Sequence, residues 1–257
     1  MHTLFVNSQV IVGTWDAVYS RYLQEIMTYG DRFVGRNGET KALFGSSITV
    51  DLKQGFPLTR LRKMPIQNLF REFLFDIGFD QNVDALGPAR HFWDFLADDL
   101  GNLGASAYNR QWRMWPPSQP DSRVANEVLD DTEVDQLQQV IYKLRGSSNT
   151  RHATVITHNP TAINPGCPPC HIALQFMPRP NGELDLMVPA RSNDMVVGFP
   201  LDIARYAIMT HVIARAVGMA PGKVYMPSAN SHIYENCYDL AETMIARSAK
   251  TECRLLL

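Results

Sequence analysis

The sequence has few cysteines, no long uncharged apolar run and almost no net charge. Its four cysteines are too few and too unevenly spaced for a disulfide framework, so we expect reduced thiols in a cytoplasmic protein. No uncharged apolar stretch reaches the roughly 18 residues that a membrane-spanning helix needs. The first 30 residues lack the basic start and apolar core of an export signal. A net charge of −2 is not the basic field that binding to nucleic acid or to an acidic membrane requires, so neither partner is expected.

The composition is that of an ordinary globular protein. Hydrophobic residues make up 45% of the 257 residues and charged residues 19%, which excludes disordered, collagen-like and coiled-coil chains. The chain shows neither a repeat of fixed period nor a low-complexity block. We therefore expect one domain over residues 1–257.

The first half of the chain contains signals for a hairpin and a helix. Asn37-Gly38 is a turn signal, and residues 43–52 mix apolar and polar side chains as a half-buried strand does, which predicts two strands around the turn. Apolar residues recur at helical spacing over residues 66–77, after Pro65 and before a helix-ending Gly78.

The second half alternates strands and helices without a regular rhythm. A helix is expected from Thr132, as its N-cap, to Gly146, and a second, largely apolar helix over 201–217. Short strands are expected over 153–157, 172–177 and 183–188. The pattern predicts an α+β fold built on a mixed sheet.

The segment Cys167-Pro168-Pro169-Cys170-His171 can be interpreted in several ways. The two thiols suggest a metal or redox site, but a structural zinc needs four nitrogen or sulfur ligands and no second pair follows, so no metal is expected. A single cysteine is more often a buried small apolar residue than a nucleophile. Residues elsewhere in the chain favour the nucleophile.

Several motifs occur together in a recognisable order. They are Pro169-Cys170-His171, Arg191-Ser192-x-Asp194, Gly198-x-Pro200 and His232-Ile233-Tyr234. In these motifs the chain resembles the thymidylate synthase superfamily. Further similarity lies in Arg36-Asn37-Gly38, Phe44-Gly45, Gly55-Phe56-Pro57-Leu58, Glu72, Trp93-Asp94, Tyr108, Gln111-Trp112-Arg113 and Asn159-Pro160. The resemblance implies a homodimer, a nucleotide 5′-monophosphate as substrate and 5,10-methylenetetrahydrofolate as the one-carbon donor.

In that chemistry Cys170 is the nucleophile. Carbon 5 of a pyrimidine is a poor nucleophile, but a thiolate that adds to carbon 6 turns the ring into an enolate or enamine that can attack an electrophilic carbon. A cationic Arg191 beside the sulfur favours its charged form. Glu72 is expected to organise water and relay protons, although a plain surface glutamate is the alternative, and Tyr108 is expected to support removal of the proton at carbon 5.

The resemblance also implies binding roles. The phosphate is assigned to Arg36, Arg191, Ser192 and Arg151, with Arg151 reaching across the dimer interface. His152 stands where a second arginine is usual, and a mostly neutral histidine cannot form the bidentate fork. The sugar hydroxyl is assigned to His232 and Tyr234, and the folate to Trp93 and Asp194.

Asp202 stands where uracil-specific members of the family carry asparagine. A carboxylate only accepts hydrogen bonds and repels O4 of uracil, whereas cytosine offers an N4 amino donor and, once protonated, an N3 donor. The substrate is therefore expected to be a cytidylate, unless Asp202 is only the N-cap of a helix. Pocket shape, which the sequence does not give, distinguishes ribose from deoxyribose.

The acidic residue makes the chain most similar to phage deoxycytidylate hydroxymethylases. Only 23 residues, 235 to 257, follow Tyr234, and they lack the tail that closes over folate in thymidylate synthases. A site open to water is expected to give 5-hydroxymethyl-dCMP, and a sealed one the methyl product. Methylation of dCMP or dUMP remains an alternative, as does a nucleotide-binding protein without turnover. The expected location is the cytoplasm, that of a host cell if the protein is phage-encoded.

Overall fold

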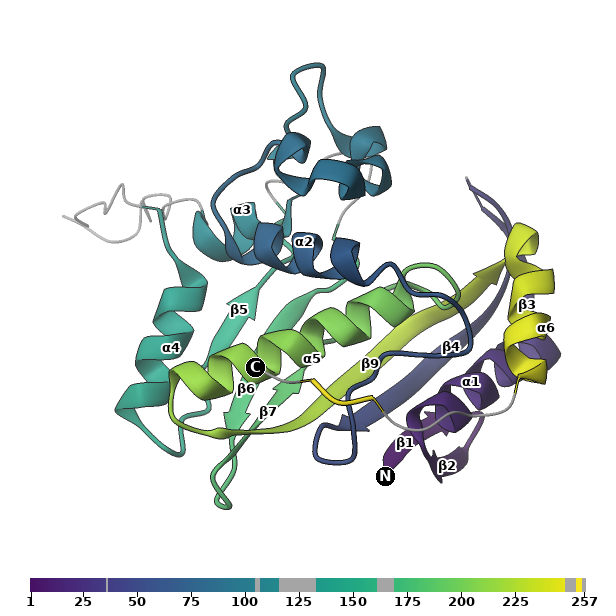
Figure 1. The fold of residues 1–257 in the computed structure, drawn as a ribbon, viewed down its shortest axis with the longest axis horizontal. Coiled ribbons are helices and arrows are strands. Elements are labelled where there is room, and N and C mark those ends of the chain that lie inside the picture. The colour runs from purple at the N-terminus through teal and green to yellow at the C-terminus, as the bar shows by residue number, and fades with distance from the viewer. Residues whose placement is uncertain (36, 105–106, 116–132, 161–168, 248–252, 256–257) are drawn as a thin grey trace, which may run out of the picture.

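The computed structural model describes residues 1–257 except 36, 105–106, 116–132, 161–168, 248–252 and 256–257 (Figure 1). Its centre is a nine-stranded sheet in the order β2-β1-β4-β9-β7-β6-β5, with β3 pairing with β4 and β8 with β9. The strands are β1 His2–Val6, β2 Gln9–Gly13, β3 Asp31–Gly35, β4 Gly38–Asp51, β5 Thr154–Ile156, β6 Ala173–Pro178, β7 Glu183–Met187, β8 Asn193–Asp194 and β9 Ala220–Tyr234. Strands β7 and β8 pair with β9 in parallel and the other pairs are antiparallel, so the predicted α+β fold with a mixed sheet is confirmed.

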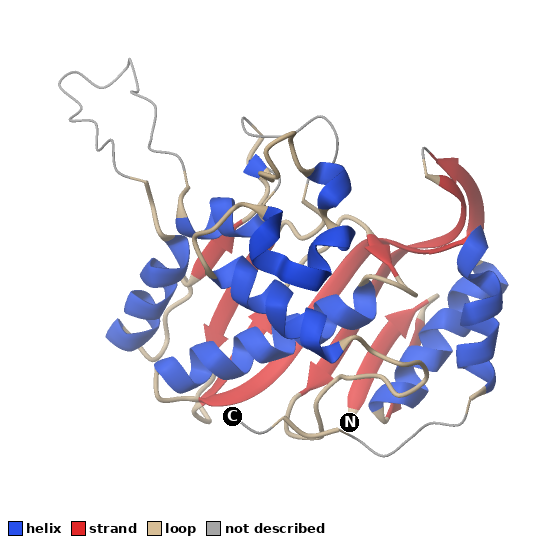
Figure 2. Cartoon of the chain, turned by 45° about the horizontal axis from the view of Figure 1, so that its top comes forward, coloured by secondary structure: helices blue, strands red, loops and turns tan. Residues whose placement is uncertain are grey.

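The helices gather on one face of this sheet (Figures 1 and 2). They are α1 Trp15–Tyr29, α2 Ile66–Ile77, α3 Tyr108–Arg113, α4 Gln136–Gly146, α5 Phe199–Ala216 and α6 Tyr238–Ala246, with short 3-10 helices over Val83–Phe92, Asp94–Leu96 and Glu235–Cys237. Helix α5 lies along the centre of the sheet and is buried almost all round, because α2 packs on its outer side. The functional site described below lies where these two helices meet the end of the sheet.

The opposite face of the sheet carries exposed apolar side chains. Met187, Gln175 and Tyr225 are register partners across β7, β6 and β9, and the residues that alternate with them, such as Leu186 and Val224, are buried beneath the helices. Met187 is nevertheless 43% exposed. No helix among the described residues packs on this face.

Most of the predicted elements are present. The turn at Asn37-Gly38 joins β3 to β4, and the amphipathic stripe before Gly78 forms α2. The three predicted short strands correspond to β5, β6 and β7, and the apolar segment 201–217 to α5. These patterns were readable because each buries one face, or all of itself, against the rest of the protein.

The predicted start of α4 was wrong, and the alternative role of Asp202 as an N-cap is excluded. Thr132, the expected N-cap of α4, lies outside the described residues, and the cap is Asp135, whose carboxylate accepts a hydrogen bond from the Gln138 amide at 2.9 Å. Asp202 is not an N-cap either: α5 begins at Phe199 after the cap residue Gly198, which places Asp202 inside the first turn. Its carboxylate instead accepts a hydrogen bond from Arg205.

In the part of the chain that is described, we find no helix with the length and apolar character needed to cross a membrane.

Candidate active site

Cys170 lies beside Arg191 because two loop segments run together at the end of the sheet. The Arg191 amide donates to the Cys170 carbonyl at 2.9 Å, and its Nε donates to the Pro169 carbonyl at 2.9 Å. These contacts hold the guanidinium so that Nη2 lies 3.7 Å from the Cys170 sulfur. The thiol is partly exposed. A cation thus lies within hydrogen-bonding reach of an accessible sulfur, an arrangement that favours the nucleophilic thiolate.

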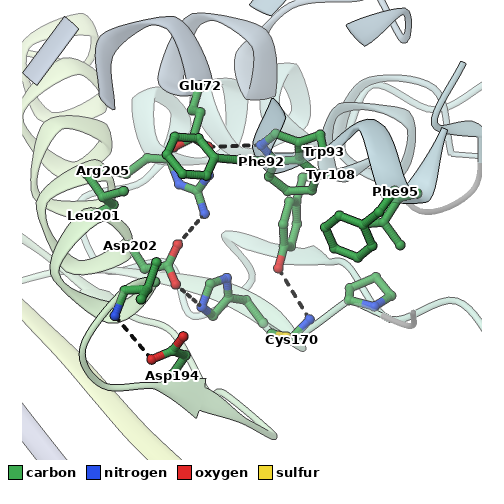
Figure 3. Close-up of a pocket in the computed structure, with 15 residues that line it drawn as sticks. Glu72, Phe92, Trp93, Phe95, Tyr108, Cys170, Asp194, Leu201, Asp202 and Arg205 are labelled. Atoms are coloured by element: carbon green, nitrogen blue, oxygen red, sulfur yellow. Dashed lines mark hydrogen bonds and ion pairs between the residues drawn. The ribbon is translucent and has the colours of Figure 1, made fainter. Parts of the chain in front are cut away.

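The thiol faces a cavity of about 320 Å³ (Figure 3). One wall is apolar and aromatic, and the other carries carboxylates that come from α2, β8 and α5. The lining residues are Glu72, Phe92, Trp93, Phe95, Leu96, Tyr108, Pro169, Cys170, His171, Asp194, Val197, Gly198, Leu201, Asp202 and Arg205. The structure therefore brings Cys170, Glu72, Tyr108, Asp202, Trp93 and Asp194 into one cavity.

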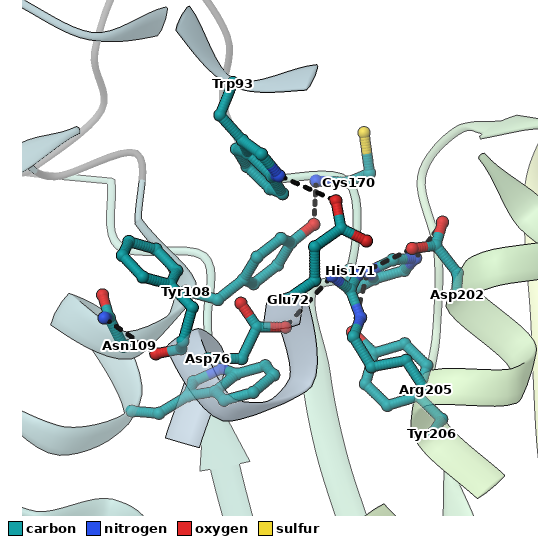
Figure 4. A network of polar contacts seen from close by, with 12 residues as sticks. Glu72, Asp76, Trp93, Tyr108, Asn109, Cys170, His171, Asp202, Arg205 and Tyr206 are labelled. Atoms are coloured by element: carbon teal, nitrogen blue, oxygen red, sulfur yellow. Dashed lines mark hydrogen bonds and ion pairs between the residues drawn. The ribbon is translucent and has the colours of Figure 1, made fainter. Parts of the chain in front are cut away.

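Glu72 is buried and hydrogen-bonded. It projects from α2, and the Trp93 indole donates to its Oε1 at 2.9 Å (Figure 4). Burial raises the pKa of the carboxyl above its usual value, while Arg205 and the indole hydrogen bond oppose the rise. A carboxyl in such a setting is suited to take up and release a proton.

Tyr108 links the wall of the cavity to the cysteine loop. Its hydroxyl accepts a hydrogen bond from the Cys170 amide at 3.3 Å, and its ring stacks on His171 with centroids 5.6 Å apart. Burial raises the pKa of the hydroxyl well above its usual value, with the neighbouring Cys170 and Asp202 adding to the rise. The group is therefore a neutral hydrogen-bonding partner next to the thiol.

Asp202 presents its carboxylate to the cavity from the first turn of α5. Its Oδ1 accepts from Nη2 of Arg205 at 2.6 Å, and its Oδ2 lies 3.6 Å from Nε2 of His171. Burial raises the pKa of this carboxyl and Arg205 opposes the rise. Burial also lowers the pKa of His171 well below its usual value, so the imidazole is neutral beside Asp202.

A second, more polar cavity of about 430 Å³ lies on the other side of Arg191. It gathers Ser192, His232 and Tyr234 from the segments around β8 and β9, together with Gly35, Asn37, Gly38, Thr40, Arg191 and Asn230. His232 Nδ1 lies 2.8 Å from the amide oxygen of Asn230, and burial lowers the pKa of the imidazole. Because Arg191 lines this cavity and also touches Cys170, a bound anion would lie next to the thiol.

Several of the residues singled out in the sequence, His152 among them, are not placed in either cavity. Arg36 and Cys167 lie outside the described residues. Arg151 is exposed on the segment that precedes β5, where its carbonyl accepts from the side chain of Gln175 at 3.4 Å. Gln175 lies on the helix-free face of the sheet, so Arg151 is near that face and away from the pockets of its own chain.

Sequence reasoning missed three residues at the site. His171 follows Cys170 directly, and the Tyr206 hydroxyl lies 2.7 Å from its Nδ1. Arg205 and Asp76 form a buried ion pair, Nη1 to Oδ2, of 3.0 Å. The available signals were a charged residue inside the apolar segment 201–217 and an acid inside the stripe 66–77, since a buried charge requires a partner.

The residues of the cavity that the Cys170 thiol faces also fit a folate. Phe92, Phe95 and Leu96 supply an apolar wall against which a flat conjugated ring can pack, and Trp93 adds an indole at its edge. The Asp194 carboxylate offers acceptors to ring nitrogens, although its Oδ1 already accepts from the amides of Val196 and Val197. The two cavities together therefore suit a charged nucleotide and an aromatic cosubstrate.

A comparison with protein families agrees with this arrangement. The model of the thymidylate synthase family matches residues 17–257, a range that includes every residue of the two cavities. The chain therefore belongs to the thymidylate synthase family.

Proposed function

We propose that the protein transfers a one-carbon unit from 5,10-methylenetetrahydrofolate to carbon 5 of dCMP and yields 5-hydroxymethyl-dCMP. Transfer of a one-carbon unit from a folate to a pyrimidine nucleotide is the activity of the family. The choice of cytosine and the hydroxymethyl product are the new parts of the proposal. The observation that carries it is the Asp202 carboxylate in the same cavity as the Cys170 thiol.

Cys170 is proposed to add its sulfur to carbon 6 of the ring. The Arg191 guanidinium, 3.7 Å from that sulfur, favours the thiolate and also lines the polar cavity in which we place the phosphate. Ser192 and Arg36 are proposed to complete the phosphate site. His232 and Tyr234, in the same cavity, are proposed to bind the sugar hydroxyl.

Asp202 is proposed to select the base. A carboxylate accepts hydrogen bonds and donates none, so it suits the N4 amino group of cytosine and repels O4 of uracil. When N3 becomes protonated as the ring is activated, the same carboxylate accepts from N3 and N4 in a charge-assisted pair. The 21% exposure of its side chain leaves one edge of the carboxylate to the cavity.

Glu72 and Tyr108 are proposed to move protons around the ring. Glu72 has a pKa raised by burial, which lets it hold a proton at a higher pH than a surface glutamate does. The neutral Tyr108 hydroxyl beside the Cys170 amide is proposed to support removal of the carbon 5 proton. When bound, methylenetetrahydrofolate supplies the electrophilic carbon; Trp93 and Asp194 are proposed to hold its ring.

The active protein is proposed to be a homodimer in the cytoplasm, where its soluble substrates are found. A second copy would cover the exposed apolar side chains of the helix-free sheet face, among them Met187 and Ile156 at 43% and 42% exposure. Arg151 lies near that face and is proposed to reach the phosphate of the partner's nucleotide. This assignment explains why it lies away from the cavities of its own chain.

The hydroxymethyl product is proposed for a cavity that stays open to water. Among the described residues of the C-terminal segment, Cys253 bonds to Phe56 and Leu58, and none of Cys253–Leu255 lines either cavity. A cavity reached by water favours addition of water to the carbon 5 methylene over transfer of a hydride. The methyl product is the alternative outcome.

The test is an incubation with methylenetetrahydrofolate and dCMP or dUMP tritiated at carbon 5. We expect tritium release from dCMP and 5-hydroxymethyl-dCMP by mass spectrometry. Cys170→Ser should lose turnover by at least ~10³-fold while it still binds dCMP in a calorimetric titration. Methyl-dCMP would correct the product, preferential release from dUMP would overturn the choice of base, and binding without release from either nucleotide would identify a non-catalytic protein.

A further inference from the structure

Arg205 joins the base-selecting carboxylate to a second buried carboxylate. It lies one turn after Asp202 on α5, and its Nη2 donates to Asp202 Oδ1 at 2.6 Å. The other arm, Nη1, lies 3.0 Å from Oδ2 of Asp76 on α2 (Figure 4). One guanidinium therefore bridges two acids that come from different helices.

Arg205 borders the cavity, but its side chain is almost wholly buried and its guanidinium is held in place. The side chain of Arg205 is 4% exposed, against 21% for that of Asp202. The rings of Tyr108 and Tyr206 lie near it, with centroids 5.6 and 5.7 Å from the guanidinium carbon. Because Asp202 is bonded to Arg205 and is the more exposed of the two, Arg205 can act on a ligand through Asp202.

The ionisable groups around Asp202 and Arg205 come from several elements. They are Glu72 and Asp76 from α2, Tyr108 from α3, Tyr206 from α5, His171 from the segment before β6, and Arg191 from the segment before β8. Burial lowers the pKa of His171 and raises those of the two tyrosines, so these three groups are neutral at pH 7. Of the cations, Arg205 is the one bonded to the Asp202 carboxylate.

We propose that Arg205 is a positioning residue that keeps Asp202 ionised and aimed at the base, and that Asp76 limits how strongly it does so by binding its other arm. The proposal rests on the proposed function of Asp202 in choosing the base. It assigns the discrimination between amino-bearing and oxo-bearing pyrimidines to the three residues together.

The reason is that discrimination depends on the charge of the carboxyl. An ionised carboxylate has no proton to give to O4 of uracil. A protonated carboxyl has one donor and one acceptor, so it matches N3–H and O4 of uracil as well as N4–H and N3 of cytosine. Burial drives Asp202 toward that protonated form, and the bound guanidinium opposes it. Loss of Arg205 should therefore weaken the preference for dCMP while the Asp202 carboxyl remains in the cavity.

Asp76 should act in the opposite direction. Its carboxyl shares the guanidinium with Asp202, and burial raises its pKa although Arg205 opposes the rise. An asparagine at this position removes the competing negative charge, so that Asp202 alone retains the ion pair with Arg205. Asp202 should then stay ionised to a lower pH.

The experiment measures the ratio of the dCMP and dUMP dissociation constants by calorimetry between pH 5.5 and 8.5. The ratio cancels the titration of the phosphate, which the two nucleotides share. The proteins are the wild type, Arg205→Gln, Asp76→Asn, and Arg215→Gln as a control at an exposed site near the end of the same helix. Circular dichroism checks that each variant is folded.

We expect the wild type to prefer dCMP and to lose this preference as the pH falls. In Arg205→Gln the preference for dCMP at pH 7 should drop about tenfold and return at a pH about one unit higher. In Asp76→Asn the pH at which half of the preference is lost should move down by up to about one unit. Arg215→Gln should match the wild type. A general loosening of the site would weaken the binding of both dCMP and dUMP. It would not move the half-loss pH in opposite directions in Arg205→Gln and Asp76→Asn.

The outcomes separate this inference from the proposed function. A wild type without preference for dCMP at any pH overturns the role of Asp202 in selecting the base. A wild type that prefers dCMP, with an unchanged half-loss pH in Asp76→Asn, overturns the role of the bridge. Because Asp76→Asn removes a buried charge and keeps its shape, that result decides the matter even if Arg205→Gln does not fold.

Discussion

The guanidinium of Arg191 lies 3.7 Å from the sulfur of Cys170, measured from Nη2 to Sγ, and also lines the polar cavity on its other side. Two backbone carbonyl contacts to this loop, from the Arg191 amide and Nε, fix its position. One cation therefore lies between the group proposed to attack the ring and the place proposed for the phosphate. Binding of the anion and activation of the thiol are coupled through it.

This contact predicts that Arg191→Gln slows alkylation of Cys170. The variant lacks the charge that favours the thiolate, so the rate with iodoacetamide at pH 7 should fall about tenfold, which corresponds to about 1.4 kcal/mol. The rate is measured by fragment-ion mass spectrometry that localises the label to Cys170, which separates it from Cys167 on the same peptide and from Cys237 and Cys253 on others. Arg191→Lys is the control, since it keeps the charge, and should retain most of the rate. An unchanged rate in Arg191→Gln would show that the guanidinium does not affect the sulfur.

The position of Asp202 predicts that Asp202→Asn shifts preference toward dUMP. The amide can donate to O4 and accept from N3–H of uracil, so the repulsion of O4 disappears. The ratio of kcat/KM for dCMP to that for dUMP, measured by tritium release, should fall by at least about tenfold, within the ~1–3 kcal/mol that a misplaced hydrogen-bonding group costs. Asp194→Asn changes a carboxylate of the same cavity that we assign to the folate, and should leave the ratio unchanged. A constant ratio in Asp202→Asn would remove the argument for cytosine.

The sequence predicted the parts of the fold that have a regular pattern of burial. The stripe of α2 and the apolar α5 each follow from helical spacing. Helix α1 carries the same signal, with Trp15, Tyr19, Tyr22 and Ile26 buried on one face, although no helix was predicted there. The spacing of its apolar residues makes α1 as predictable as α2.

Strand β9 is a different case, because its sequence argues against its structure. It is central, between β4 and β7, yet it contains Pro221, Gly222 and Pro227, which are usual for loops or edge strands. Pro227 is accommodated because its carbonyl still accepts a hydrogen bond from the Ala190 amide at 2.9 Å. This strand is defined by its pairing with the neighbouring strands and with the loop before β8. Its local sequence could therefore not predict it.

The site likewise contains residues that the sequence predicted and residues that it did not. The motif residues Cys170, Asp202 and Glu72 were found by resemblance and do lie in one cavity. The Asp76–Arg205 bridge joins residues 129 positions apart, 205 minus 76, and neither belongs to a motif. Each was visible as a charge in an apolar helix, but the pairing of the two depends on how α2 packs on α5.

Glu72 and Trp93 predict a change in pH dependence. The indole hydrogen bond favours the ionised carboxylate, so its loss in Trp93→Phe should raise the pKa of Glu72 further. The infrared carbonyl band of protonated Glu72, identified by its absence in Glu72→Gln, should then persist to a higher pH than in the wild type. A band that titrates at the same pH in both proteins would show that the indole does not act on this carboxyl.

The same raised pKa predicts a sign for stability. Above the usual pKa of 4.5 the unfolded state releases its proton while the folded state still holds it, so the folded state binds more protons. The free energy of unfolding of the wild type, relative to that of Glu72→Gln, should therefore fall as the pH rises from 4.5 until Glu72 ionises in the folded protein. Urea unfolding at a series of pH values measures this difference.

The same substitution also tests the catalytic role. Turnover of Glu72→Gln should fall by about 10²-fold or more.

The placement of Arg151 predicts that two inactive variants restore each other. If Arg151 serves the partner's site, Arg151→Ala and Cys170→Ser are each defective, but a mixed dimer has one site with both native residues. Refolding the two variants together in equal amounts makes about half of the dimers mixed, each with one intact site, so about a quarter of the wild-type activity should return. Mixing Arg151→Ala with Arg191→Gln should also restore activity, because the Arg151→Ala chain then has a native Arg191 and a partner with a native Arg151. Mixing Cys170→Ser with Arg191→Gln should not, because each change disables the site of the chain that carries it, and both sites of the mixed dimer are then defective. If Arg151 instead acted within its own chain, every site in the mixed dimers would carry a defect and no activity would return.

The oligomeric state, measured by light scattering, must be a dimer for each variant. A monomeric wild type would contradict both the shared site and the proposed use of the exposed sheet face.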